Sequence, residues 1–228
     1  MSVMSRVILV AGAGGPTGQA VVRRLAERGD TVIAVDRSGV EGCLNVDLLD
    51  AAAVAELAER IRAEHGRVDG VVHLVGGWRG SKTFAETSLA DWDLLHDLLI
   101  RTLQNVSLAF EPLLKAGDDG RFVIVSARAA QQPTQGNAAY AAAKAAAEAW
   151  TLSLADALRG TASAAVILVV TALVHDAMRA AAPDKQFKNF TDVRDIAAAV
   201  AGLWDEDAAA LNGRRIDLAP IPKDGDFS

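Results

Sequence analysis

A tyrosine and a lysine four residues apart form the pair of side chains in this sequence best suited to acid–base chemistry. Tyr140 is the single tyrosine of the 228-residue chain, and Lys144 follows it in an alanine-rich stretch that favours a helix. At this spacing the two side chains lie on one face of a helix. An ammonium group lowers the pKa of a nearby phenol, which then suits proton exchange with a carbonyl or an alcohol. Such pairs also occur on helices without any chemistry, so the interpretation depends on the surrounding elements.

A glycine-rich loop near the N-terminus is the second feature that indicates chemistry. It follows an apolar, strand-like run and precedes a helix-like pattern. Glycines let the backbone approach a pyrophosphate, which the N–H groups and the dipole at a helix N-terminus then stabilise. A tight turn that binds nothing is the alternative. The loop residues predicted to bind a dinucleotide are Gly12, Gly14, Gly15, Pro16, Thr17 and Gly18.

Acidic residues after the next two strands strengthen the dinucleotide hypothesis. Asp36 ends the second apolar run, where a carboxylate can accept hydrogen bonds from the adenosine ribose hydroxyls. A carboxylate there repels a 2′-phosphate, so NAD is the preferred cofactor. Arg37 keeps NADP possible, because a guanidinium can pair with that phosphate. Asp47 and Leu48 are expected near the adenine, although an ordinary loop aspartate would give the same pattern.

Apolar strands that alternate with helix-like blocks predict the scaffold for these residues. Near-continuous apolar strands call for a parallel sheet with helices on both faces. The predicted fold class is therefore α/β: a single Rossmann-type doubly wound parallel sheet of about seven strands, in one domain over residues 1–228. The expected strands are Arg6–Ala11, Thr31–Val35, Cys43–Val46, Val68–Val75, Arg121–Ser126, Ala164–Val170 and Arg215–Leu218. The expected helices are Thr17–Arg28, Asp50–Gly66, Ser88–Leu114, Asn137–Leu158 and Thr191–Trp204.

The other candidate residues follow the carboxyl ends of these strands, the usual ligand edge of an open parallel sheet. The predicted cofactor contacts there are Val75, Gly76, Gly77, Thr171 and Leu173. The predicted substrate contacts are Trp78, Ala127 and His175. Trp78 as simple packing and His175 as a loop residue without chemistry are the alternatives. The segment 176–190 is expected to form a mobile lid over the pocket, or else a plain surface loop.

These features together resemble the short-chain dehydrogenase/reductase family over nearly the whole chain. The motifs that carry the resemblance are the loop Gly12–Gly18, Asp36, Asp47 and the pair Tyr140 and Lys144. Within the family the sequence is most similar to dihydropteridine reductases and related bacterial reductases, through the stretches Val75–Trp78 and Ser126–Ala130.

The resemblance implies an NAD(P)-dependent oxidoreductase acting on a small carbonyl, quinonoid or alcohol substrate. Tyr140 would be the acid or base, and Lys144 would bind the nicotinamide ribose and hold the pKa of Tyr140 down. Because the cofactor carries the hydride, the protein supplies positioning and one proton. The resemblance also implies a homodimer or homotetramer.

Several positions depart from the family pattern. Ala127 occupies the place of the usual catalytic serine, and Ser126 beside it points to the opposite face of its strand. Leu99 aligns with the asparagine that supports a proton-relay water in most members. Dihydropteridine reductases also lack that serine and asparagine, so the resemblance favours an activated or conjugated acceptor. A catalytically silent NAD(P)-binding or sensing protein is the second hypothesis.

Composition excludes several classes of partner. The formal net charge of -6 argues against a nucleic-acid or anionic membrane surface. With one cysteine, Cys43, no intramolecular disulfide and no cysteine-based metal site can form, and the four histidines lack a ligand-like spacing. The longest apolar run, Ala162–Val174, fits a buried strand rather than a membrane span. We expect a cytoplasmic protein with no metal.

Overall fold

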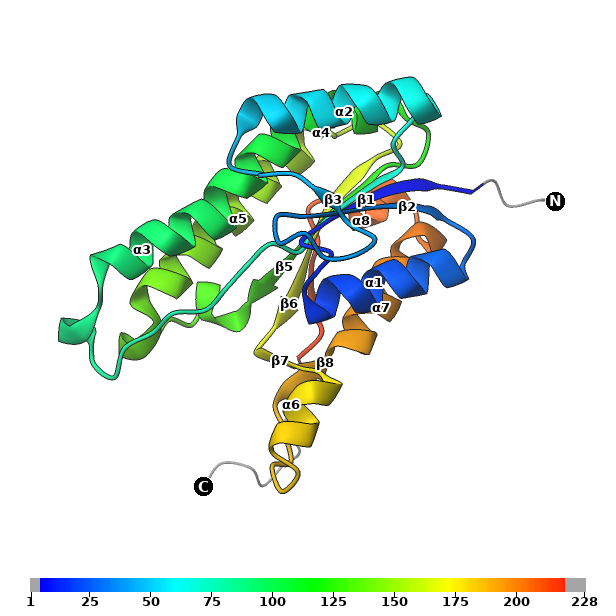
Figure 1. Ribbon diagram of the computed structural model, residues 1–228. Coiled ribbons are helices and arrows are strands. Elements are labelled where there is room, and N and C mark those ends of the chain that lie inside the picture. Colours follow the sequence, from blue (N-terminus) through cyan, green and yellow to red (C-terminus); the bar gives the residue numbers. More distant parts are fainter. Residues whose placement is uncertain (1–4, 220–228) are drawn as a thin grey trace.

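The computed structural model describes residues 5–219, and its centre is a seven-stranded sheet (Figure 1). Neighbouring strands pair in parallel, in the order β3-β2-β1-β4-β5-β6-β9. The predicted α/β fold class is confirmed, whereas residues 1–4 and 220–228 of the predicted single domain lie outside the described residues. The strands are β1 (Val7–Ala11), β2 (Thr31–Asp36), β3 (Leu44–Asn45), β4 (Gly70–His73), β5 (Arg121–Ala127), β6 (Ala164–Val170) and β9 (Arg215–Asp217).

Two layers of helices cover the sheet and bury one apolar core on each face (Figure 1). Successive side chains of a strand point to opposite faces, so Leu9 of β1 packs in one core and its neighbours Ile8 and Val10 pack in the other. One face carries α1 (Pro16–Glu27), α7 (Val193–Gly202) and α8 (Ala208–Leu211). The other carries α2 (Ala51–His65), α4 (Thr102–Ala116) and α5 (Ala138–Ala157).

The long helix expected from Ser88 to Leu114 is interrupted. It consists of α3 (Leu89–His96), a π-helical turn over Asp97–Arg101, and α4. The hydroxyl of Thr102 donates a hydrogen bond of 2.7 Å to the carbonyl oxygen of Leu98. In a regular α-helix this carbonyl would accept the backbone N–H of residue 102, so a side chain takes part in the hydrogen bonding at the break. Insertion of a side chain into the hydrogen-bond ladder of a helix is an established cause of a helix distortion.

The segment after β6 is more ordered in secondary structure than a plain loop. β7 (Ala172–Val174) pairs in parallel with β8 (Phe190–Asp192) in a separate two-stranded sheet, and α6 (Asp176–Ala181) lies between them. The expectation that Thr191 caps the next helix is wrong. Thr191 is buried in β8 with its hydroxyl on the Leu218 carbonyl, and the carboxylate of Asp192 caps α7 by accepting the Arg194 N–H at 2.9 Å. Among the helices of residues 5–219, none has the length and apolarity needed to cross a bilayer.

Candidate active site

Two adjoining cavities lie where the sheet strands end. The larger measures about 600 Å³ and the smaller about 190 Å³, and Leu74, Val75 and Gly76 line both. The smaller cavity extends from these residues to Gly12 and Asp36, and the larger extends to Tyr140. A ligand that spans both would therefore run from the first two strands to helix α5.

The glycine loop is held against the end of β4 by contacts that exclude side chains. Gly12 has a φ of +80°, and a Cβ atom on it would lie 2.9 Å from the backbone of Leu74 and Val75. A Cβ atom on Gly18 would lie 2.3 Å from the carbonyl oxygen of Gly12. Helix α1 begins directly after Gly15, its N-cap, which has no side chain to occupy the helix N-terminus. The loop thus presents backbone rather than side chains to the cavity.

Asp36 is fixed beside this loop. Its Oδ2 accepts the N–H of Gly14 at 3.0 Å, and its Oδ1 accepts the backbone N–H of Ser38 at 2.9 Å and the Ser38 hydroxyl. Partial burial raises the pKa of this carboxyl, but the hydrogen bonds from Ser38 and Gly14 and the charge of Arg37 outweigh burial and hold the pKa below its ordinary value. Asp36 is therefore ionised at neutral pH.

The structure gathers most of the predicted cofactor residues along the two cavities. Those that line the smaller cavity are Gly12, Gly15, Asp36, Arg37, Asp47, Leu48, Val75 and Gly76. Those that line the larger are Thr17, Val75, Gly76, Gly77, Tyr140, Lys144, Thr171 and Leu173. The structure does not bring Gly14, Pro16 and Gly18 into either lining. These three residues have structural roles instead. Gly14 leaves space for the Asp36 side chain, Pro16 is the first residue of α1, and Gly18 packs against Gly12.

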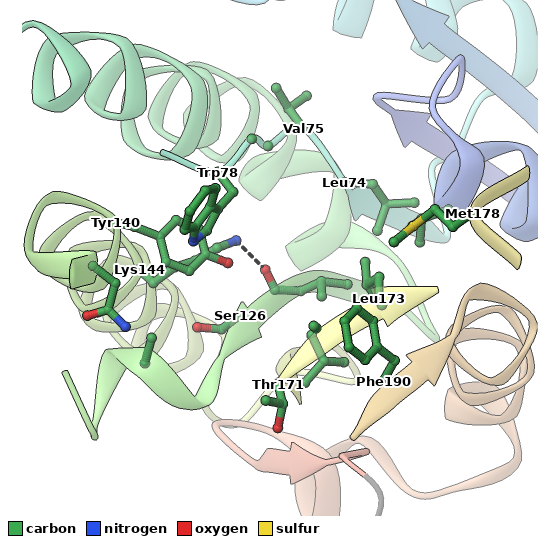
Figure 2. A pocket seen from close by; sticks show the side chains of 18 residues that line it. Leu74, Val75, Trp78, Ser126, Tyr140, Lys144, Thr171, Leu173, Met178 and Phe190 are labelled. Atoms are coloured by element: carbon green, nitrogen blue, oxygen red, sulfur yellow. Dashed lines mark hydrogen bonds between the residues drawn. The ribbon is translucent and has the colours of Figure 1, made fainter. Parts of the chain in front are cut away.

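Tyr140 and Lys144 lie together at the larger cavity, as Figure 2 shows. Helix α5 carries both, and the ammonium nitrogen of Lys144 is 5.9 Å from the centre of the Tyr140 ring. That ammonium donates a hydrogen bond of 2.7 Å to the carbonyl oxygen of Val125 on β5 (Figure 2). The lysine is therefore anchored on the strand.

The expectation that Lys144 holds the pKa of Tyr140 down is wrong for the chain by itself. Burial raises the pKa of Tyr140 to about 12 and lowers the pKa of Lys144 to about 8, against which the charge of Glu148 acts. The hydrogen bond of Lys144 goes to a backbone carbonyl, and desolvation dominates the titration of the phenol. At neutral pH the tyrosine keeps its proton and the lysine keeps its charge.

Of Ser126 and the three predicted substrate contacts, only some line the larger cavity. Ser126 belongs to the lining, but its hydroxyl donates a hydrogen bond of 2.5 Å to Glu148 on α5. The predicted substrate contacts Ala127 and His175 do not belong to the lining: Ala127 is buried at the end of β5, and His175 precedes α6 as its N-cap. Trp78 does line the cavity and is 62% exposed.

Sequence reasoning missed several lining residues, most of them apolar. Met178 and Phe190 belong to the segment expected as a lid, and the structure places both at the cavity (Figure 2). Asn137 comes one helical turn before Tyr140, a spacing that could have identified it. The further lining residues are Leu74, Val125, Ala129, Val170 and Ala172 of the larger cavity, and Val46, Leu49, Leu98 and Thr102 of the smaller.

The residues present fit a nicotinamide dinucleotide. The loop leaves no space for side chains at Gly12 and Gly18, the N-terminus of α1 has no side-chain cap, and an ionised carboxylate lies at the far end. The larger cavity has room for the nicotinamide and a small substrate beside Tyr140. Within residues 5–219, no group of three or more histidine, cysteine, aspartate or glutamate side chains is arranged to hold a metal ion.

A family model described as short chain dehydrogenase matches residues 6–186. The chain belongs to this family. It is 27% identical to the 3-oxoacyl-[acyl-carrier-protein] reductase FabG of Escherichia coli, over 96% of this chain and 97% of that one. It is also 27% identical to a benzil reductase of Saccharomyces cerevisiae, but this match covers 67% of the chain and 66% of the yeast enzyme.

Solved structures show the same fold. A short chain dehydrogenase of Shigella flexneri, complexed with NADP, superposes with a TM-score of 0.82 at 24% identity, over 93% of this chain and 96% of that one. The aldohexose dehydrogenase of Thermoplasma acidophilum, in a ligand-free form, gives a TM-score of 0.81 at 20% identity, over 96% and 97%. At these identities the likeness concerns the fold alone.

Proposed function

We propose that this protein is an NAD(P)-dependent oxidoreductase that reduces a small, uncharged carbonyl compound with Tyr140 as the proton donor. The observation that carries the proposal is the position of Tyr140 and Lys144 in a cavity that adjoins the glycine-loop cavity and shares Leu74, Val75 and Gly76 with it. A redox cofactor bound across both cavities would have one end beside the phenol. Family membership agrees with this activity and does not favour the silent sensing alternative.

The chain's own residues would bind and orient the cofactor and hold one proton. The glycine loop and α1 would bind the pyrophosphate, Asp36 the adenosine ribose, and Lys144 the nicotinamide ribose. A bound nicotinamide dinucleotide supplies or takes the hydride. Tyr140 holds its proton at neutral pH, because burial raises the pKa of the phenol to about 12. In the reduction direction the hydroxyl of Tyr140 gives this proton to the substrate oxygen as the carbonyl carbon gains the hydride.

The lining favours a flat, apolar, conjugated acceptor. Trp78, Leu173, Met178 and Phe190 supply apolar surface, and Lys144 is the charged side chain among the lining residues (Figure 2). An ordinary ketone would find no second hydroxyl donor, because Ala127 has none and the Ser126 hydroxyl donates to Glu148. The missing donor would cost roughly 2–4 kcal/mol if it acted like an oxyanion-hole group. A conjugated or vicinal dicarbonyl compound needs less polarisation. The resemblance to dihydropteridine reductases remains part of this proposal.

We also propose NAD as the preferred cofactor, a homo-oligomeric assembly and a cytoplasmic location. An ionised Asp36 supports NAD, since it would repel a 2′-phosphate. Two exposed leucines, Leu108 on α4 and Leu152 on α5, support assembly through these helices. Light scattering after gel filtration would measure the assembly.

The test of the function is turnover with NADH and NADPH on aromatic diketones, quinones and simple ketones, before and after Tyr140→Phe. We expect oxidation of the coenzyme with the conjugated acceptors and a fall of roughly 100- to 10,000-fold in kcat for the variant. Coenzyme affinity should stay unchanged.

Ser153→Ala provides the matched control. It removes an exposed hydroxyl from the same helix, where Ser153 donates to the Ala149 carbonyl, and should leave turnover unchanged. Full turnover by Tyr140→Phe would refute the assigned role, and no turnover on any acceptor would refute the activity.

A further inference from the structure

A buried acid, Glu148, lies one helical turn beyond Lys144 on α5 and lines neither cavity. Its side chain is 9% exposed. The hydroxyl of Ser126 donates to its Oε1 at 2.5 Å, and the guanidinium Nε of Arg215 on β9 donates to its Oε2 at 3.1 Å. Two strands therefore fix the carboxylate at the base of the helix face that carries Tyr140 and Lys144.

Lys144 is an equally buried charge with few partners. The residue is 9% exposed, and the hydrogen bond from its ammonium goes to the neutral carbonyl of Val125. The titratable groups that face it are Tyr140 and Glu148 on α5 and His73 on β4. Both Tyr140 and His73 are uncharged at neutral pH, because burial raises the pKa of the former to about 12 and lowers that of the latter to about 3.

Glu148 is thus the anionic group that faces this ammonium. Residues four apart on a helix are neighbours, and an acid with a lysine at this spacing attracts it. Burial alone lowers the pKa of Lys144, and the charge of Glu148 is the opposing influence that leaves it at about 8. Without the acid, the lysine would lose its proton closer to neutral pH.

We propose that Glu148, held by Ser126 and Arg215, is a positioning residue that keeps the buried Lys144 ammonium charged beside Tyr140. The consequence of this charge for catalysis rests on the proposed function. It also explains why Ser126 does not replace the missing hydroxyl at Ala127: its hydroxyl supports the acid instead. Arg215 limits the effect, because its positive charge offsets part of the charge of Glu148.

A purely structural ion pair between Glu148 and Arg215 would explain the same contacts, but it predicts a different result when either partner is removed. Removing either partner would then destabilise the protein without a defined effect on Lys144. In our account the two removals have opposite effects on Lys144: Glu148→Gln removes attraction, and Arg215→Gln removes repulsion and leaves the acid less neutralised.

The experiment measures acetylation of Lys144 by a trace of acetic anhydride from pH 6 to 11, read by peptide mass spectrometry on the ligand-free protein. We expect a midpoint near 8 for the wild type, a midpoint about one unit lower for Glu148→Gln, and a higher midpoint for Arg215→Gln. Asp156→Asn, at an exposed acid on the same helix that pairs with Arg159, should leave the midpoint unchanged.

An unchanged or raised midpoint in Glu148→Gln, or shifts of the same sign in both variants, would overturn the inference. Near-UV circular dichroism confirms that each variant is folded. If Glu148→Gln fails to fold, Glu148→Asp keeps the charge but moves it away, and the midpoint should fall by less than one unit; a rise would again overturn the inference. Because no coenzyme is present, these results are independent of whether the proposed activity is found.

Discussion

The two cavities share three residues, yet they are built on opposite principles. The smaller one borders the glycine loop and the end of β2, and residues 46–49, 74–76, 98 and 102 complete its lining. The loop beside it is packed backbone on backbone, so that a Cβ atom at Gly18 would overlap Gly12. The larger one draws on segments far apart in the chain and contains a buried lysine and a half-buried phenol. In the first, the residues that fit the ligand also stabilise the fold. In the second, the charge of Lys144 is buried at a cost to stability.

The strongest test of this contrast is Gly18→Ala in the glycine loop. The new Cβ would lie 2.3 Å from the Gly12 carbonyl oxygen and 2.5 Å from the Ala13 Cα. Both are backbone atoms, so the loop itself must move. We expect a loss of about 3 kcal/mol or more in the free energy of unfolding, together with loss of coenzyme binding, measured by urea denaturation and calorimetry.

Gly202→Ala is the control for this substitution. A Cβ there meets no atom within 4 Å, and Gly202 is the last residue of helix α7, so we expect no loss of stability and a gain of up to about 1 kcal/mol. A Gly18→Ala protein as stable as the wild type would show that the loop is not closely packed at Gly18.

In contrast to Gly18→Ala, the variant Lys144→Met in the larger cavity is expected to be more stable than the wild type. Burial lowers the pKa of Lys144 from the ordinary value of 10.5 to about 8, so the charged form opposes folding. We expect the variant to lose turnover while its free energy of unfolding rises by about 1–3 kcal/mol at pH 7. A less stable variant would show that the lysine contributes more through its contacts than burial costs.

The pH dependence gives the sign of this effect. Between pH 8 and 10.5 the unfolded state binds more protons at residue 144 than the folded state does, so the stability of the wild type should rise with pH in this window. Below pH 8 the penalty is fully present, and above 10.5 it is gone. The difference in unfolding free energy between Lys144→Met and wild type should therefore shrink from pH 7 to pH 10. A constant difference would contradict the assignment.

The smallest expected effect concerns the choice of coenzyme. Asp36→Asn removes the negative charge but keeps an acceptor for the ribose, so affinity for NADPH relative to NADH should rise about tenfold. Arg37→Ala should lower the relative affinity for NADPH, since it removes a cation from the same cavity. Parallel calorimetric titrations measure both ratios. Equal ratios in wild type and Asp36→Asn would exclude the carboxylate as the determinant.

Much of the fold could be predicted because its signals are local. Apolar runs identified all seven strands of the main sheet, and Asp50 and Gly66 mark the ends of α2 as capping chemistry requires. The break in the long helix could not be predicted, because it depends on a hydrogen bond from the Thr102 hydroxyl to the Leu98 carbonyl. The β7–β8 pair is short and joins segments on either side of α6, so periodicity gave no sign of it.

The site divides in the same way. The glycine loop and Asp36 form a sequence motif, and the structure gathers most of their predicted partners around the smaller cavity. The surroundings of Tyr140 depend on tertiary packing. Strand alternation suggested that Ser126 faces away from the site, but Ser126 lines the larger cavity and its hydroxyl donates to Glu148. The raised pKa of Tyr140 depends on burial, which spacing along a helix does not reveal.

Calorimetric titration of the ligand-free protein with NADH and with NADPH is the decisive measurement, because the roles proposed for the glycine loop, Asp36 and Tyr140 all require a dinucleotide across the two cavities. We predict saturable binding of at least one coenzyme with a Kd below about 1 mM, tighter for NADH, retained in Tyr140→Phe and lost in Gly18→Ala. Absence of saturable binding by either coenzyme to the folded protein would contradict the account.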